Sequence, residues 1–152
     1  MSPESNEATL VEQNKDAFRR IIEEGFSKGN LSALDLVVAA DFVEHQQVRG
    51  LPPGLAGLKA MIRGLRAVLP DLTLTIEDLT VDGDKVWARL IGRGTHRGPF
   101  FGQPGTGKTV TIDVMDLARF ENGKLVEHWG VPDRFSLLEQ LDLLPKPQAP
   151  KA

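Results

Sequence analysis

The spacing of apolar residues changes near Pro70, and this change constrains the fold more than any other feature of the chain. Before Pro70, apolar residues recur every three to four positions, which is the spacing of amphipathic helices. After Asp71 they alternate with polar residues, as in Leu72–Glu77, which is typical of strands with one buried face. Helices first and strands afterwards predict the α+β fold class, with a largely antiparallel sheet and helices on one face.

The helical part of the pattern ends at recognisable stop signals. Lys28-Gly29-Asn30 closes the first helix, Pro70 closes the third, and Asp133 is a favourable N-cap for the last. A loop is expected at 41–53. The expected helices are roughly 8–26, 31–38, 54–69 and 133–141.

Two turn signals join the strands of the second half. Asp82-Gly83-Asp84 and Glu121-Asn122-Gly123-Lys124 are both typical of β-hairpins. A Gly- and Pro-rich loop, 95–108, separates the two hairpins. The expected strands are 72–77, 86–94, 109–120 and 125–130.

Length and charge limit the classes of protein that the chain can belong to. Its 152 residues predict one domain, placed at 8–145, with disordered ends at 1–7 and 146–152. The net charge of −3 and the lack of a basic cluster argue against nucleic acid as a partner. There is no cysteine, which excludes disulfides, zinc–thiolate sites and thiol catalysis. The polar N-terminus lacks an apolar signal core, so we expect a cytoplasmic protein with no membrane partner.

Residues 102–109, GQPGTGKT, match the phosphate-binding P-loop pattern. In a P-loop the glycine-rich turn must lead into a helix, whose N-terminal amides hold the phosphates. Here the motif is followed by TVTIDVMDLARF, which alternates as a strand does. We therefore expect no nucleotide to bind, and Lys108 to be an exposed lysine at the start of a strand.

Asp116 and His128 are the strongest candidates for chemistry. Asp116 is in phase with apolar residues of its strand, and a carboxylate there must be bonded, paired or raised in pKa. His128, in phase with Val126 and Gly130, should lie beside Asp116 across the hairpin. Such a pair suits acid–base catalysis, although a structural ion pair or a core histidine would have the same pattern.

Several other residues are candidates for the lining of a pocket. The chain has three histidines, and their spacing matches no metal site, so we expect no metal. His96 lies in a glycine-rich loop, where a role in holding the loop is favoured over a role in binding. The candidate lining residues are Phe42, His96, Phe100, Phe101, Val114 and Val126.

Five segments, spread over about residues 10–145, carry a family resemblance. They are NLSALDLVVAADFVEH, PPGLAGLKAMIRGLRAVLPDLTLTIEDL, GTHRGPFFGQPGTGKTV, FENGKLVEHWG and LLEQLDLLP. In this order the chain resembles the SnoaL-like polyketide cyclases, or ester cyclases, of the nuclear-transport-factor-2-like superfamily. The resemblance implies a cone-shaped domain, in which a curved sheet and three to four helices enclose an apolar pocket.

The resemblance also implies a reaction. The prototypes close a polyketide ring by aldol condensation, with acid–base residues and without a cofactor or metal. Their catalytic Asp aligns with Gly130 here and their pocket His aligns with Asp116, so Asp116 and His128 form a swapped arrangement. His45 falls at the expected pocket mouth and is a candidate to stabilise an enolate. The implied function is a cofactor-free cyclase or isomerase acting on a hydrophobic carbonyl compound.

Two alternatives to this function stay open. One is a non-catalytic small-molecule binding domain, suggested by Gly130. The other is a hydrolase or dehydratase, for which the superfamily uses two carboxylates with an arginine between them. Asp113 and Asp116, with Arg89 or Arg93, are the candidates, but the two aspartates face opposite ways on a regular strand. The fold is also commonly a homodimer, for which Trp87 and Trp129 are candidate contacts.

Overall fold

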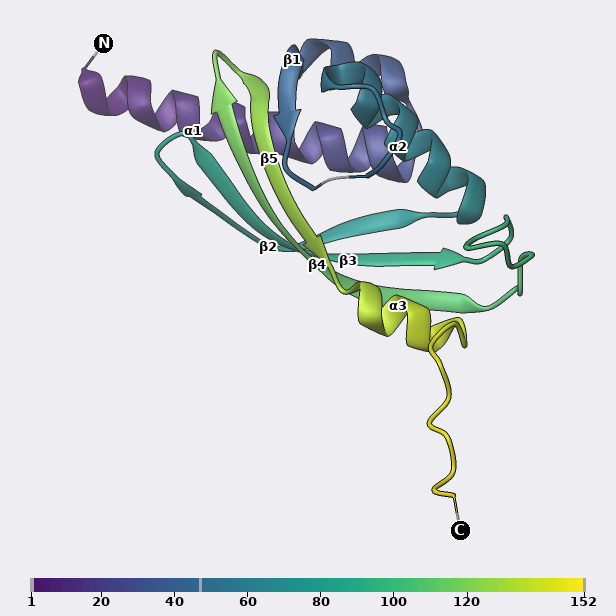
Figure 1. Ribbon diagram of the computed structural model, residues 1–152. Coiled ribbons are helices and arrows are strands. Elements are labelled where there is room, and N and C mark those ends of the chain that lie inside the picture. The colour runs from purple at the N-terminus through teal and green to yellow at the C-terminus, as the bar shows by residue number, and fades with distance from the viewer. Residues whose placement is uncertain (1, 47, 152) are drawn as a thin grey trace.

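The helices of the N-terminal half lie on one face of a curved sheet formed mainly by the C-terminal half (Figure 1). The computed structural model describes residues 2–46 and 48–151. The helical elements are α1 (Pro3–Arg20), the π-helical η1 (Ile21–Ser27), the 3₁₀-helical η2 (Leu31–Leu36), α2 (Gly54–Val68) and α3 (Arg134–Gln140). The strands are β1 (Val38–Glu44), β2 (Thr73–Asp82), β3 (Lys85–Thr95), β4 (Thr109–Glu121) and β5 (Lys124–Pro132).

The strands form one five-stranded sheet in the order β1-β5-β4-β3-β2. Tight turns join β2 to β3 and β4 to β5, so these pairs are antiparallel, as is the central pair β3–β4. Only β1, at the edge, runs parallel to its neighbour β5. The predicted α+β class, with its largely antiparallel sheet and both hairpins, is confirmed.

The loop expected at 41–53 is wrong in its first part, because residues 41–44 belong to strand β1. Its apolar residues do not alternate strictly with polar ones, and Val38-Ala39-Ala40-Asp41 carries no strand signal of its own. The partner of β1 lies more than 80 residues later in the chain, where Glu44 pairs with His128. A strand that depends on so distant a partner leaves little trace in local periodicity.

The first helix also begins earlier than the expected Ala8. Ser2 caps it by accepting a hydrogen bond from the amide of Ser5, and Pro3 occupies the first turn, where its missing N–H costs nothing. At the other end the helix changes to the π-helix η1 rather than continuing as a regular α-helix to Phe26.

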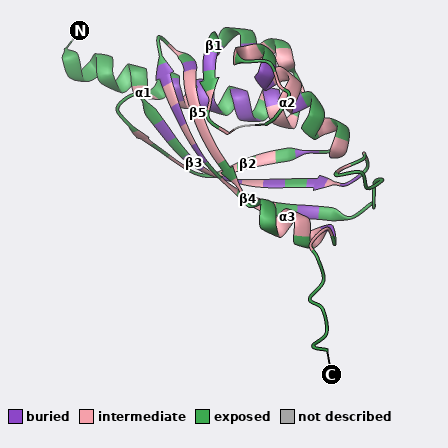
Figure 2. Ribbon diagram, in the orientation of Figure 1, coloured by how far each residue is buried: buried purple, intermediate pink, exposed green. Residues whose placement is uncertain are grey.

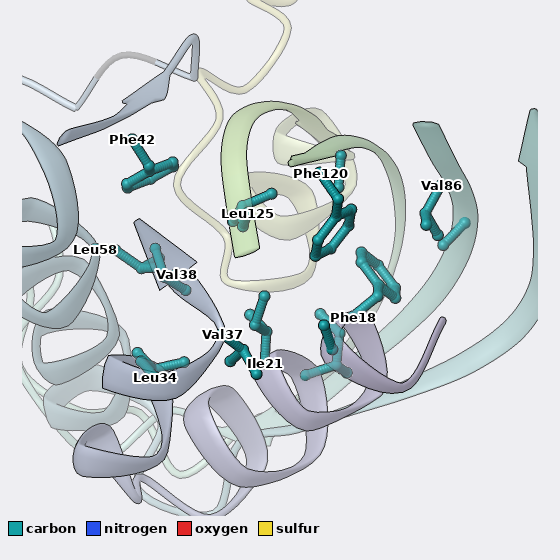
Figure 3. Close-up of a cluster of buried hydrophobic side chains, with 14 of the residues drawn as sticks. Phe18, Ile21, Leu34, Val37, Val38, Phe42, Leu58, Val86, Phe120 and Leu125 are labelled. Atoms are coloured by element: carbon teal, nitrogen blue, oxygen red, sulfur yellow. The ribbon is translucent and has the colours of Figure 1, made fainter. Parts of the chain in front are cut away.

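The main core lies between the helices and the inner face of the sheet (Figure 3). Phe18 and Ile21 from the first helical stretch meet Phe120 and Leu125 from the β4–β5 hairpin. Each is at most 5% exposed, and burying a side chain of this size stabilises the fold by roughly 1.5–3 kcal/mol. Figure 2 shows the buried residues gathered in this layer, while α3 has none.

Arg66 of α2 fastens the helical layer to the start of the sheet. Its guanidinium group donates hydrogen bonds to four backbone carbonyls, which belong to Phe26, Ser27, Pro70 and Leu72. Two of these carbonyls lie at the end of η1, where a helix leaves its last carbonyls unpaired.

The P-loop-like segment leads into a strand, as predicted. β4 begins at Thr109, the last residue of the motif, so the glycine-rich turn leads into a strand and not into a helix. Lys108 forms an ion pair with Asp142. The loop is fastened internally by His96, which is fully buried and whose Nδ1 lies 3.0 Å from Thr106 Oγ1.

α3 begins at the predicted cap, because the side chain of Asp133 accepts a hydrogen bond from the amide of Ser136. Its other end contacts the part of β4 that extends beyond β5. There the carboxamide of Gln140 accepts from the amide of Thr111 and donates to its carbonyl, at 2.9 and 2.8 Å. A side chain thus satisfies a stretch of strand edge that would otherwise lack a partner.

Candidate functional site

Asp116 and His128 lie in contact on the inner face of the sheet, which is the face that carries the core. In the β4–β5 pairing Asp116 is opposite Gly130 and Ala118 is opposite His128, so the two side chains are diagonal neighbours. His128 Nε2 lies 3.1 Å from Asp116 Oδ1. The contact expected from the sequence is therefore present.

A β-bulge in this hairpin changes which residues accompany His128. The register shifts between Arg119 and Phe120, so that Phe120 is opposite Leu125 while Arg119 is opposite Glu127. Val126 falls at the bulge without a partner in the register. The buried Leu125, rather than the expected Val126, is thus the inward-facing residue that precedes His128.

Glu44 is a third member of the site that sequence reasoning missed. It ends β1 directly beside His128, and its two carboxylate oxygens lie 2.9 and 2.8 Å from His128 Nδ1. The backbone amide of Gln46 donates to the same carboxylate at 2.9 Å. Because the segment was expected to be a loop, nothing in the sequence placed this carboxylate next to the histidine.

The two carboxylates determine the charge of His128. Burial by itself lowers the pKa of a histidine, but hydrogen bonds and attraction from Asp116 and then Glu44 outweigh it. Together they raise the pKa of His128 from 6.5 to about 10. At neutral pH the side chain is therefore an imidazolium whose two N–H groups both point at carboxylates.

Gly130 leaves a small space directly above this cluster. A Cβ atom at Gly130 would lie 2.5 Å from Gln46 Oε1, 2.8 Å from His128 Cε1 and 3.0 Å from Asp116 Oδ1. The first two distances are shorter than side chains tolerate. The glycine therefore lets three polar side chains converge on one point.

A cavity of about 530 Å³ opens beside the cluster, between β1, α2 and the segment that joins them. Phe42, Glu44 and Gln46 contribute to its wall, whereas Asp116 and His128 are not among its lining residues. The remaining lining residues are mostly apolar and include Val48, Leu51, Pro52, Leu58 and Met61. Glu44 and Gln46 thus form the boundary between the cavity and the buried pair.

Of the expected lining residues, Phe42 is in the cavity wall and the others lie elsewhere. Val114 packs against the main core. Phe100 packs in a second cluster with Leu69 and Leu141, and Phe101 is 75% exposed. His96, as described above, is buried in its own loop.

His45 lies on the opposite face of the sheet from His128. Its ring stacks on Trp129 with centroids 4.4 Å apart, and its Nε2 lies 2.8 Å from Glu127. Glu127 and Trp129 alternate with His128 along β5 and therefore face outwards. The structure does not bring His45 to the Asp116–His128 pair, because it is the residue directly after the inward-facing Glu44.

The arrangement considered for a hydrolase is not assembled either. Asp113 is 63% exposed on the outer face, with an oxygen 3.6 Å from Arg89 Nη1, while Asp116 faces the core. Within the described residues, no group of three or more His, Asp or Glu side chains is arranged to hold a metal ion. The helices in that part of the chain include none long and apolar enough to cross a membrane.

Comparisons with known proteins agree on the family. A model of the SnoaL-like polyketide cyclases matches residues 16–141. TsrD from Streptomyces laurentii is 29% identical, with a TM-score of 0.76, over 90% of this chain and 97% of that one. IdmH from Streptomyces antibioticus, a proposed polyketide cyclase, is 32% identical, with a TM-score of 0.76, over 86% of this chain and 99% of that one. AclR from Streptomyces galilaeus, a proposed hydroxylase, is 27% identical, with a TM-score of 0.77, over 90% and 89%.

The curved sheet, its helical cover and these neighbours define the nuclear-transport-factor-2-like cone fold, in the form that serves cyclases and hydroxylases of small molecules. The chain belongs to the SnoaL-like polyketide cyclase family. The resemblance found in the sequence is thereby confirmed. No curated protein gives a significant match to the sequence.

Proposed function

We propose that the protein is a cofactor-free cyclase or isomerase that moves a proton next to the carbonyl group of a hydrophobic, polyketide-like compound. The observation that carries this proposal is the buried Asp116–His128 contact of 3.1 Å, which Glu44 links to the wall of a cavity in a SnoaL-like fold. Buried acid–base pairs beside apolar cavities are the usual setting for such proton transfers.

In this mechanism Asp116 is the base. Its carboxylate removes the proton from the carbon next to the carbonyl, so that the C–H bond breaks, an O–H bond forms and the electron pair moves to the carbonyl oxygen. The resulting enolate either attacks a second carbonyl carbon, which closes a ring and leaves an alkoxide that takes the proton from Asp116, or takes the proton back at another carbon. His128 stays protonated at neutral pH, because its pKa is about 10, so it supplies positive charge and orientation rather than acting as the base.

Turnover of aromatic polyketide-like esters tests these roles. We expect Asp116→Asn and His128→Ala each to lower kcat by about 10²–10⁴-fold, which is the usual contribution of an acid–base residue. Asp113→Asn, in the same strand on the other face, and His45→Ala should leave turnover unchanged. Circular dichroism of each variant shows that a loss of rate is not a loss of folding. Unchanged turnover in both Asp116→Asn and His128→Ala would contradict the assignment of these two residues as catalytic.

A non-catalytic binding domain is the second candidate. It is favoured by Gly130, which occupies the position of the prototypes' catalytic aspartate and leaves no carboxylate there. Tight binding of an aromatic ketone with no turnover of any ester in the panel would support this candidate over the first.

We also infer that the protein forms a homodimer through the outer face of the sheet. Trp87, Met115 and Val131 are 46%, 52% and 70% exposed on this face, which is more apolar surface than a strand usually leaves in water. Sedimentation at micromolar concentration should show a dimer, and Met115→Asp should shift it towards the monomer. A wild-type monomer would contradict the inference.

A further inference from the structure

Gln46 is the side chain that joins the cavity to the buried pair. It contributes to the cavity wall, and its Oε1 lies 2.5 Å from the point where a Cβ atom of Gly130 would be. Asp116 Oδ1 and His128 Cε1 lie within 3.0 Å of the same point. A molecule in the cavity therefore meets the Gln46 carboxamide before it reaches Asp116.

The backbone of Gln46 is held so that its side chain stays in this place. The amide of Gln46 donates to Glu44, whose carboxylate in turn accepts from His128 Nδ1. Gln46 lies two residues after Glu44, the last residue of β1, and lines the same cavity as Phe42 and Glu44. The backbone of Gln46 is thus anchored to the same cluster that its carboxamide approaches.

The other polar groups of the cluster cannot hold a carbonyl oxygen. The two carboxylates accept hydrogen bonds and, when ionised, donate none. Both N–H groups of the His128 imidazolium are directed at Glu44 and Asp116. Of the three side chains nearest to this point, Gln46 is the one whose N–H donor is not directed at a carboxylate, and a half-turn of its carboxamide presents that donor.

We propose that Gln46 is a substrate-binding residue that donates a hydrogen bond to the carbonyl or enolate oxygen of the substrate. Gly130 is then a specificity-determining position, because any side chain there would displace the Gln46 carboxamide. The proposal rests on the proposed function for the identity of that oxygen. It requires only binding, however, and so can be tested without turnover.

A matched pair of probes separates the hydrogen bond from apolar contact. 2-Acetylnaphthalene carries a carbonyl oxygen, whereas 2-ethylnaphthalene has nearly the same shape without it. In equilibrium dialysis the wild-type protein should bind the ketone more tightly than the hydrocarbon. Gln46→Met, which keeps the length of the side chain but removes its donor, should weaken binding of the ketone about 5–10-fold and leave the hydrocarbon unchanged.

Two further variants complete the test. Gly130→Ala should produce the same selective loss by displacing the carboxamide, and Gln13→Met, on the exposed face of α1, should change neither affinity. The proposal would be overturned if the wild-type protein bound the two probes equally. It would also be overturned if Gln46→Met preferred the ketone as strongly as the wild-type protein does.

The outcome is separable from the test of the proposed function. If Asp116→Asn keeps full turnover while Gln46→Met loses the ketone preference, the catalytic assignment fails and the binding role of Gln46 stands. If Asp116→Asn abolishes turnover while Gln46→Met keeps the preference for the ketone, the catalytic assignment stands and the binding role of Gln46 fails.

Discussion

The two faces of the β4–β5 hairpin carry the same kinds of side chain in opposite surroundings. On the inner face His128 lies between Asp116 and Glu44, and its side chain is 13% exposed. On the outer face His45 lies against Glu127, which also binds Arg119, and the side chain of His45 is 38% exposed. Both histidines are thus paired with a glutamate that comes from the neighbouring strand or strand end.

The difference shows that burial, and not residue type, separates a candidate catalytic pair from a surface ion pair. Inside, burial by itself lowers the pKa of His128, but hydrogen bonds and attraction from Asp116 and Glu44 outweigh it and raise the pKa to about 10. Outside, hydrogen bonds from His45 and then Arg119 lower the pKa of Glu127, and water screens the remaining charges. Only the inner cluster combines a raised pKa with access to a cavity.

The largest expected difference between the two faces is the loss of stability when the glutamate that pairs with each histidine is replaced. Glu44→Gln replaces a hydrogen bond between charged groups by one to a neutral amide, and we expect it to lower the free energy of unfolding by about 2 kcal/mol. Glu127→Gln is the matched change on the outer face and should have a clearly smaller effect. Urea denaturation, followed by tryptophan fluorescence, measures both, and equal losses would contradict the contrast drawn between the faces.

The free energy of unfolding should also depend on pH through the inner-face His128. In the unfolded chain His128 releases its proton near pH 6.5, but in the folded protein it does so near pH 10. Below pH 6.5 both states are protonated and the stabilisation is fully present. Between these values folding takes up a proton, so the free energy of unfolding should fall by up to about 1.4 kcal/mol per pH unit as pH rises.

Urea denaturation at pH 7, 8 and 9 measures this slope. The chain has no Cys and no Tyr, so few other groups titrate in this window. His128→Gln should remove the slope, and His45→Gln should retain it. A slope that survives in His128→Gln would assign the linked proton to another group.

Local patterns were sufficient for much of the fold. Both β-hairpins were predicted from their turn residues, and the helix at 54–69 and the cap at Asp133 from spacing and residue type. The Asp116–His128 contact was also predictable, because one short hairpin joins the two strands and determines their register apart from the bulge. In each case the deciding residues are close in the sequence.

Contacts between distant segments were not predictable in this way. β1 forms only because β5 lies beside it, and Glu44 meets His128 only because β1 forms. The same pairing turns His45, one residue further on, towards the outer face and away from its expected role.

The sequence by itself thus determined the class of fold, the family, and a carboxylate and an imidazole on adjacent strands, because periodicity, turns and hairpin register are local properties. Only the tertiary structure decided the charge of His128, which depends on Glu44 of β1, and the place of Gln46, which lies against Gly130 of β5. Burial and hydrogen bonding between segments 84 residues apart have no signature in local order.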